Sequence, residues 1–243
     1  MEGFAIFALF GVVVAGFAVL AWYLAKKRRE DLARVARGLG LSFTPRDPFA
    51  GESFGRSSGF LASLFGSSQR GIPGRFGQFG ALARGDSRRG YNVMRGTYRG
   101  REVCAFDYKY STGSGKNRTT HHLSAAAVGL GARFPELYIR PEGLFDKLAG
   151  AVGFEDIDFE SHEFSKRFYV KSRDRKLAYD VIHPRAMEYL LAHPRWSIEL
   201  DGADALVSTG RTWKPHEFRE ALDALAGFLD LVPEFVWKDV GRA

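Results

Sequence analysis

The first part of the chain is a single uncharged apolar run. Residues 4–25, FAIFALFGVVVAGFAVLAWYLA, carry no charged side chain. At about 1.5 Å per residue, a helix of this length spans roughly 33 Å, enough for the ~30 Å hydrocarbon core of a bilayer. Trp22 and Tyr23 stand at its C-terminal end, where amphipathic rings favour the headgroup level. We therefore predict a transmembrane anchor with its basic flank over residues 1–29.

Four basic residues follow the apolar run at once: Lys26, Lys27, Arg28 and Arg29. Only Glu2 is charged before the run, whereas a cleaved signal peptide has a basic start and a small-residue cleavage site. The positive-inside rule places the basic flank in the cytoplasm. The sequence predicts an uncleaved single-pass protein of the plasma membrane, N-terminus outside and C-terminal domain cytoplasmic, with the lipid bilayer as its first partner.

The helical pattern continues beyond the anchor. Apolar residues recur with the spacing i, i+3, i+4, i+7 at Leu32, Val35, Ala36 and Leu39. Glycines then end the helix, and residues 41–44 have the composition of a strand. We expect residues 30–45 to form a juxtamembrane helix and a first strand, with the apolar stripe of the helix docked on the domain.

Residues 46–90 have no regular period and are rich in Gly, Ser, Phe and Arg. Flexible linkers lack such aromatics, so we expect a partly ordered loop whose phenylalanines pack onto the domain or the membrane face. Phe76 and Phe79 are two of these phenylalanines.

From residue 91 the pattern becomes that of strands. Arg99 and Gly100 separate two β-like runs, which predicts a short hairpin. In the second run the side chains from Cys104 to Tyr110 alternate between two faces. Further extended runs at 119–130 and 137–141 complete an antiparallel meander.

The remainder alternates between helical and extended patterns. Helices are predicted over 141–153, on both sides of His183–Pro184, and over 214–233. Residues 157–161 and 167–172 are β-like, and 195–210 form a hairpin across Asp201–Gly202. The fold class is therefore α+β: a transmembrane helix, then an antiparallel β-meander with helices packed on it. Residues 91–243 form one cytoplasmic domain, or two subdomains over 91–140 and 141–243.

The net charge of +7 is unevenly distributed. Residues 1–101 carry 16 Lys/Arg against 6 Asp/Glu, and residues 102–243 carry 19 against 22. A body this close to neutral disfavours nucleic acid as a partner. The single cysteine, Cys104, excludes an intrachain disulfide and a Cys-rich zinc site.

The stretch YKYSTGSGKNRTTHH, residues 108–122, is the first that suggests chemistry. A phosphate-binding loop needs Gly at position 110 and Ser or Thr at 117, where the chain has Tyr110 and Asn117. A hairpin tip explains the stretch instead. His121 and His122 are adjacent on a strand, so they point to opposite faces and cannot easily share one metal. Asp107 lies roughly opposite and could meet one of them.

A second polar cluster lies at 159–164. Glu160 and His162 would share one face of a strand, but the pattern is not the metalloprotease motif because Lys166 replaces its second histidine. No catalytic, metal or cofactor site is therefore assigned, and no cofactor is expected. The candidate residues that remain are Asp107, His121, His122, Glu160 and His162.

The order of these landmarks resembles a group of bacterial single-pass membrane proteins known only by a domain of unknown function. FDYKY, residues 106–110, and the stretch from Glu160 to Pro184 carry the similarity best. The resemblance implies a bacterial envelope protein with a cytoplasmic domain, and it carries over no catalytic residue.

Three functions compete. The leading hypothesis is a membrane-anchored interaction or scaffold module that binds a protein partner or a second copy of itself. One alternative is a hydrolase-like enzyme that uses Asp107, His121 or His122. The other is binding of anionic lipid or nucleic acid by the Arg-rich segment 70–101.

Overall fold

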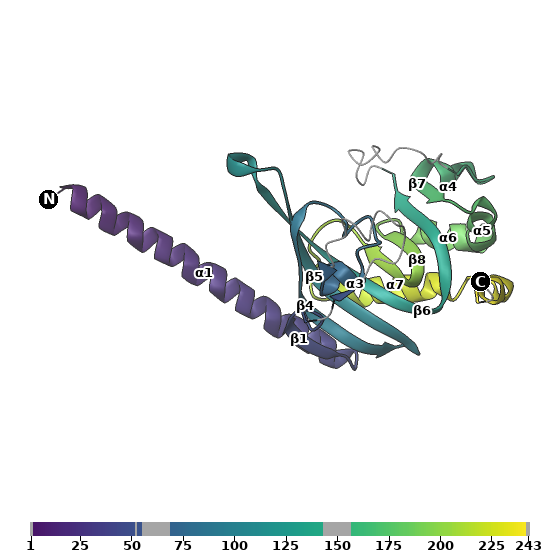
Figure 1. Cartoon of the computed structure of the whole chain (residues 1–243), viewed down its shortest axis with the longest axis horizontal. Coiled ribbons are helices and arrows are strands. Elements are labelled where there is room, and N and C mark those ends of the chain that lie inside the picture. Colours follow the sequence, from purple (N-terminus) through teal and green to yellow (C-terminus); the bar gives the residue numbers. More distant parts are fainter. Residues whose placement is uncertain (1, 52, 55–68, 143–156, 242–243) are drawn as a thin grey trace.

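The computed structural model describes residues 2–51, 53–54, 69–142 and 157–241. A long N-terminal helix projects from a body built on one antiparallel sheet with helices packed against it (Figure 1). The predicted α+β fold class is confirmed.

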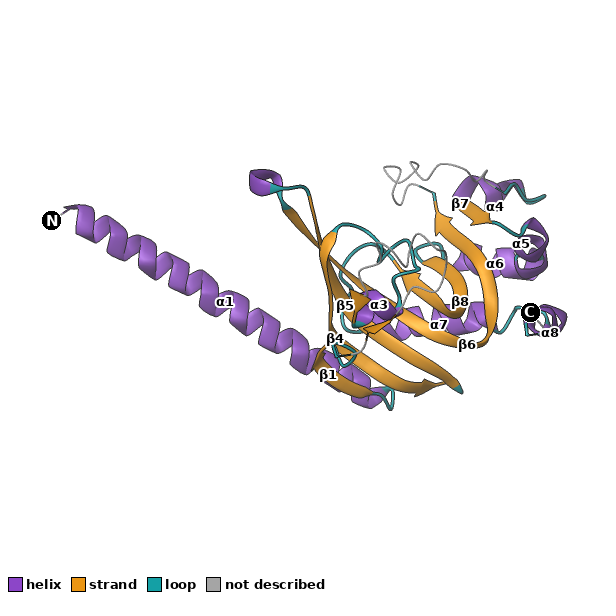
Figure 2. Ribbon diagram, viewed as in Figure 1, coloured by secondary structure: helices purple, strands orange, loops and turns teal. Residues whose placement is uncertain are grey.

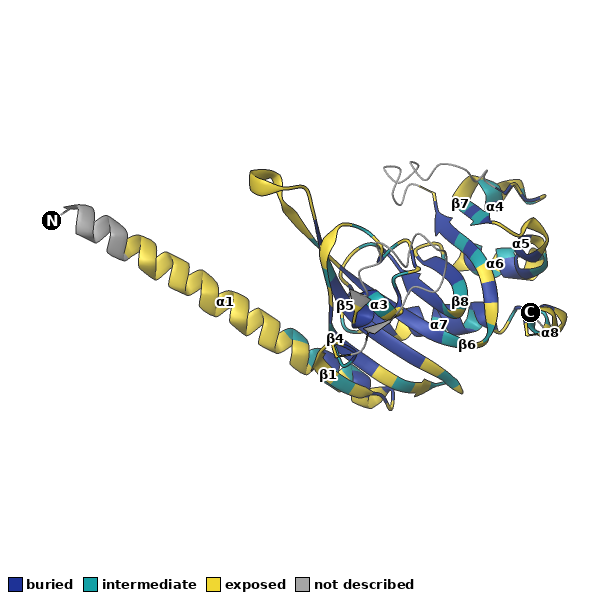
Figure 3. Ribbon diagram, in the orientation of Figure 1, coloured by how far each residue is buried: buried dark blue, intermediate teal, exposed yellow. Residues whose placement is uncertain are grey.

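Helix α1 runs from Glu2 to Gly38 without a break. Over the described residues it is the one helix long and apolar enough to cross a membrane, and its apolar part from Leu9 onward is not buried by the body (Figure 3). Its C-terminal part behaves differently, because Leu32 and Ala36, together with Leu39 just after the helix, enter the core of the body. The predicted docking of this apolar stripe is thus confirmed.

The sheet has the order β1-β4-β5-β6-β7, with β8 paired along β6. Its strands are β1 (Ser42–Arg46), β4 (Asp86–Tyr98), β5 (Arg101–Thr112), β6 (Thr119–Pro141), β7 (Phe168–Ser172) and β8 (Ser197–Ser208), and β2 (Ser53–Phe54) pairs with β3 (Gln69–Arg70) in a separate small sheet. Arg99 and Gly100 form the tight turn between β4 and β5 with φ of 49° and 75°, the left-handed values that a two-residue type I′ turn requires. This predicted hairpin is confirmed.

The helices gather on one face of the sheet (Figure 2). They are α4 (His162–Arg167), α5 (Arg175–Val181), α6 (Pro184–Ala192), α7 (Glu217–Leu229) and α8 (Glu234–Val240). They share the main core with the C-terminal part of α1. On the opposite face, a smaller core holds Phe76, Phe79 and the short helix α3 (Ile72–Arg75).

Strand β5 connects the two cores by its alternation. Cys104, Phe106 and Tyr108 lie in the smaller core, whereas Val103 and Ala105 lie in the main one. The alternation predicted for this strand is confirmed, and one residue of the second face, Asp107, is fully buried although it is charged.

Several predicted elements differ from the structure. The runs at 119–130 and 137–141 belong to one strand, β6, which bends near Gly131 (φ 68°). The predicted hairpin across Asp201–Gly202 is wrong: β8 continues through Gly202 (φ 63°) because β6 offers pairing partners on both sides of it. The break at His183–Pro184 is confirmed, with Pro184 opening α6.

The segment 46–90, predicted as a partly ordered loop, contains regular elements in its C-terminal part. Its described part from Gln69 onward contains β3, α3 and two buried phenylalanines, and its last residues, from Asp86, already belong to β4. The helix predicted over 141–153 lies almost wholly outside the described residues. Since β7 and β8 both pair with β6, the parts before and after residue 140 share one sheet.

Candidate functional site

The basic flank of α1 meets the sheet through one of its four residues. Lys26, Lys27 and Arg29 are exposed, whereas Arg28 points into the body, with its side chain 24% exposed. The guanidinium binds the carboxylate of Asp107 in a fork: Nε donates to Oδ2 at 2.8 Å and Nη2 to Oδ1 at 2.6 Å. Such bidentate pairs are both strong and geometrically specific.

Asp107 is held by the sheet as well as by the helix. Asn92 Nδ2 donates to Oδ2 at 2.8 Å, and Ser124 Oγ donates to Oδ1 at 2.7 Å. Asn92 adopts φ of 51° within the β4 irregularity between Tyr91 and Met94, and this bulge directs its amide to the carboxylate. Ser124 is the residue directly opposite Asp107 on β6. Four hydrogen bonds therefore satisfy the buried carboxylate.

The same cluster also reaches the loop before α7. Arg28 Nη1 donates to the carbonyl oxygen of Trp213 at 2.9 Å, and the Trp213 amide donates to Ser124 Oγ at 3.0 Å. The indole of Trp213 is buried edge-on against Trp196 and Phe218. We call Arg28, Asn92, Asp107, Ser124 and Trp213 the junction, because they join α1 to β4, β5, β6 and the α7 side of the body.

The electrostatics of the junction are those of a closed ion pair. Tyr91 lies opposite Asp107 on β4, and burial together with the negative charge of Asp107 raises the pKa of its phenol to about 12. The carboxylate of Asp107 has no exposed surface, so a substrate cannot reach it. The junction can hold two parts of the protein together, but it cannot act as a general base on an outside molecule.

The tandem histidines lie apart from Asp107. His121 stacks on Tyr110 with ring centroids 4.9 Å apart, and its Nε2 lies 2.8 Å from Thr112 Oγ1. His122 Nδ1 is 3.2 Å from the Tyr91 hydroxyl on the other face. The prediction that they face opposite ways is confirmed. The suggested pairing of Asp107 with one of them is wrong, because Arg28 occupies the carboxylate.

The predicted strand face shared by Glu160 and His162 is also wrong. His162 is the first residue of α4, because Ser161 caps the helix by accepting a hydrogen bond from the Phe164 amide at 3.3 Å. Glu160 precedes the cap. Among the described residues, no group of three or more His, Cys, Asp or Glu side chains is placed to hold a metal ion.

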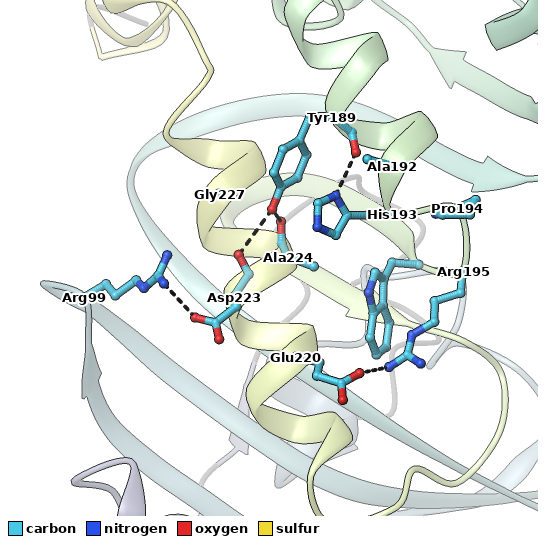
Figure 4. Close-up of a pocket in the computed structure, with 11 residues that line it drawn as sticks. Arg99, Tyr189, Ala192, His193, Pro194, Arg195, Glu220, Asp223, Ala224 and Gly227 are labelled. Carbon is cyan, nitrogen blue, oxygen red and sulfur yellow. Dashed lines mark hydrogen bonds and ion pairs between the residues drawn. The ribbon is translucent and has the colours of Figure 1, made fainter.

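A groove of about 560 Å³ lies between α6 and α7 (Figure 4). The charged groups along it pair with one another: Arg99 with Asp223 at 2.9 Å, and Arg195 with Glu220. The ring of His193 stacks on Tyr189 and its Nδ1 lies 2.8 Å from the Tyr189 carbonyl oxygen. Because these charged side chains are paired with one another, we interpret the groove as the contact between two packed helices. The described side chains that line it do not converge on one point as catalytic groups would.

Sequence reasoning assigned Arg28 to the membrane flank alone and missed the junction. The one available signal was Asp107, a charge on the same strand face as the apolar Val103 and Ala105. Such a buried carboxylate requires a partner. The partner lies 79 positions away in the chain, and no local pattern identifies it.

Fold and junction together define an α+β protein with one candidate membrane helix fixed to its sheet. A solved structure with a similar fold is the crystal structure of the mycobacterial trehalose monomycolate transport factor A, TtfA, at 16% sequence identity and a TM-score of 0.53. The match covers 85% of this chain and 93% of that one, so it includes most of the architecture. No family model and no curated protein sequence matches the chain.

Proposed function

We propose that this chain is a single-pass, membrane-anchored interaction module of a bacterial envelope, with its α+β domain held in a fixed orientation at the cytoplasmic face of the plasma membrane. The observation that carries the proposal is the junction. Helix α1 enters the body without a linker, and Arg28 fixes it there through Asp107 and the Trp213 carbonyl group. A domain that only needed tethering would not require such a contact.

Several observations favour a binding role over an enzymatic one. The carboxylate of Asp107 is paired with Arg28 in the junction. His121 and His122 lie on opposite faces of a strand, and Glu160 and His162 are separated by a helix cap. Burial raises the pKa of the Cys104 thiol to about 12, so its reactive thiolate form is negligible at neutral pH. These groups do not converge on one reacting atom.

The fold similarity suggests the more specific role. TtfA is described as a transport factor for trehalose monomycolate. We propose that this chain likewise assists the transport of an envelope lipid by binding a protein of the transport system, without altering the lipid chemically. The resemblance to single-pass membrane proteins of the bacterial envelope agrees with this role.

A complementation experiment tests the role. In a strain lacking the chain, a radiolabelled envelope lipid should accumulate in the inner membrane while its total synthesis stays unchanged. The wild-type chain and the double variant His121→Ala/His122→Ala should restore transport equally, because neither histidine belongs to the junction. Reduced synthesis of the lipid, or failure of the histidine variant at normal protein abundance, would instead support the enzyme hypothesis.

A further inference from the structure

The hairpin formed by β5 and β6 extends beyond the rest of the sheet. Strand β4 pairs with β5 only as far as Ser111, and β8 pairs with β6 only from Ala125 onward. Residues 112–120 are exposed. Figure 2 shows this end of the hairpin projecting away from the body on the same side as the N-terminal half of α1. The end of the hairpin therefore points toward any bilayer that α1 crosses.

The junction fixes how deep the hairpin reaches. Arg28 follows Ala25, the last residue of the uncharged run, by three positions, which is about 4.5 Å along the helix axis. Arg28 and the Asp107 that it binds therefore lie at headgroup level, just outside the hydrocarbon core. From Asp107 to Thr112 strand β5 adds five residues, or about 16 Å. The turn that follows thus lies about 11 Å inside the ~30 Å core, level with Phe17 of α1.

A tilt of the protein does not remove the turn from the core. Membrane helices tilt by up to about 40° from the bilayer normal. If helix and hairpin tilt together by that angle, the reach of about 16 Å becomes about 12 Å along the normal, which still exceeds the distance from Arg28 to the edge of the core. The depth of the turn is therefore a consequence of the rigid junction.

The turn has the wrong chemistry for lipid at that depth. Residues 111–120, STGSGKNRTT, are all polar residues or glycines. Arg118 is ion-paired with Asp86, whereas Lys116 forms no ion pair with a carboxylate in the described parts of the chain. Irregular backbone and an unpaired lysine find no hydrogen-bond partners in hydrocarbon, so both are expensive there. The turn requires polar surroundings inside the membrane.

Helix α1 does not supply those surroundings, either within one chain or from a second copy. Apart from Trp22 and Tyr23 at the end of the apolar run, residues 4–25 carry no polar side chain. An oligomer formed through α1 would therefore leave the turn among apolar side chains. At membrane depth, non-helical backbone is tolerated where it is buried in protein or lines a water-filled cavity. The polar groups must come from a different protein that spans the membrane.

We propose that the turn of the β5–β6 hairpin, residues 113–118, docks into a polar cavity of an integral membrane protein, open toward the leaflet from which α1 emerges. The proposal rests on the proposed function, because it requires α1 to span the bilayer and specifies the kind of transport protein that the domain binds. Lys116 fits a cavity that presents a carboxylate or several carbonyl oxygens to its ammonium group.

The hairpin is preformed for such a contact. The rings of Tyr110 and His121 stack across the stem with centroids 4.9 Å apart. Gly113 has φ of 78°, and a Cβ atom there would collide with the carbonyl oxygen of Asn117, so the turn is tightly closed. A rigid element loses little conformational entropy on docking. Because the stem side chains contact one another, the docking surface is the turn and does not include His121 or His122.

Photocrosslinking of the full chain, at its natural abundance in living cells, tests the proposal. A diazirine amino acid in place of the exposed Ser114 reacts on illumination with whatever molecule touches the turn. Mass spectrometry of the adducts should find a peptide from a membrane-spanning segment of another protein. Adducts with phospholipid, with soluble proteins alone or with a second copy of the chain would each overturn the inference, and so would the absence of any adduct.

Charge variants show whether the captured protein fits the turn. Lys116→Glu places a carboxylate where the cavity is expected to hold acceptors, so it should lower the yield of the membrane-protein adduct about five-fold or more at unchanged abundance of the chain. Lys166→Glu, at an equally exposed position on α4, should leave the yield unchanged. Equal yields in the two variants would overturn the docking of the turn.

A diazirine amino acid in place of Val19 separates failure of this inference from failure of the proposed function. If α1 spans the bilayer, position 19 forms adducts with acyl chains or with membrane-spanning segments. Such adducts at position 19, without a membrane-protein adduct at position 114, refute the hairpin contact alone. No membrane adduct at position 19 refutes the anchor, and the proposed function with it.

Discussion

Replacing Asp107 with alanine should lower the free energy of unfolding of the full-length protein by about 3 to 5 kcal/mol. The substitution leaves the Arg28 guanidinium partly buried without its counter-charge, and it leaves the donors of Asn92 and Ser124 without an acceptor. Breaking a buried pair from one side costs far more than the pair itself contributes, because the remaining charge keeps its desolvation penalty.

Urea unfolding in mild detergent, followed by the fluorescence of the buried Trp213 and Trp196, measures this loss. Asp31→Ala is the control: it removes an ion pair with the exposed Arg34, three positions along the same helix, and solvent-accessible pairs are worth about 0 to 1 kcal/mol. The double replacement Arg28→Met/Asp107→Leu should recover much of the stability lost in the single variant. Equal costs for Asp107→Ala and Asp31→Ala would show that the junction does not hold the helix.

The second large expected effect is a pH dependence of the free energy of unfolding, caused by Glu199 on β8. Its carboxylate is buried and accepts hydrogen bonds from the amides of Gly80 at 2.7 Å and Ala81 at 3.2 Å, which fastens the segment after α3 to the sheet. Burial raises the pKa of Glu199 from 4.5 to about 7, although these two amides and the charge of Arg84 oppose the rise. The folded protein therefore holds this proton more tightly than the unfolded chain does.

The sign of the pH dependence follows from that difference. The stabilisation is complete below pH 4.5, where both states carry the proton, and it is lost as the pH rises through about 7. Ionisation of Glu199 lowers the free energy of unfolding by at most about 3 kcal/mol. Glu217 does not contribute between pH 4.5 and about 7, because hydrogen bonding to Arg211 lowers its pKa to about 2.

Unfolding measured between pH 5 and pH 8 checks the prediction against Glu199→Gln. The variant keeps the size of the side chain and one acceptor oxygen but cannot ionise, so its stability should vary much less with pH than that of the wild type. If the two proteins lose stability in parallel over this interval, Glu199 is not the group responsible.

The predictions that held were those fixed by nearby residues. The helical conformation of residues 4–25, the Arg99–Gly100 turn and the alternation along β5 each depend on neighbours within a few positions. The failures at Gly202 and His162 arose where local signals compete with distant or capping partners. Gly202 has turn chemistry, yet β6 pairs with β8 on both sides of it, and Ser161 converts an extended pattern into a helix start.

The junction shows more clearly what local sequence patterns cannot predict. Arg28 has the composition and position of an ordinary membrane-flanking residue, and nothing near it in sequence distinguishes it from Lys26, Lys27 and Arg29. Its role depends on the helix docking through Leu32 and Ala36, which turns one side of the basic cluster toward the sheet. That rotation is a property of the packed structure.

The central claim is that the junction holds the domain in one orientation relative to helix α1. Pulsed electron–electron double resonance between nitroxide labels at Val19→Cys and Glu188→Cys, in nanodiscs, measures the distribution of distances between the helix and the domain directly. We predict a single narrow distance distribution for the otherwise unmodified protein and a broad one once Asp107→Ala is added. A broad distribution with Arg28 and Asp107 intact would contradict a rigid junction, and the domain would then be merely tethered.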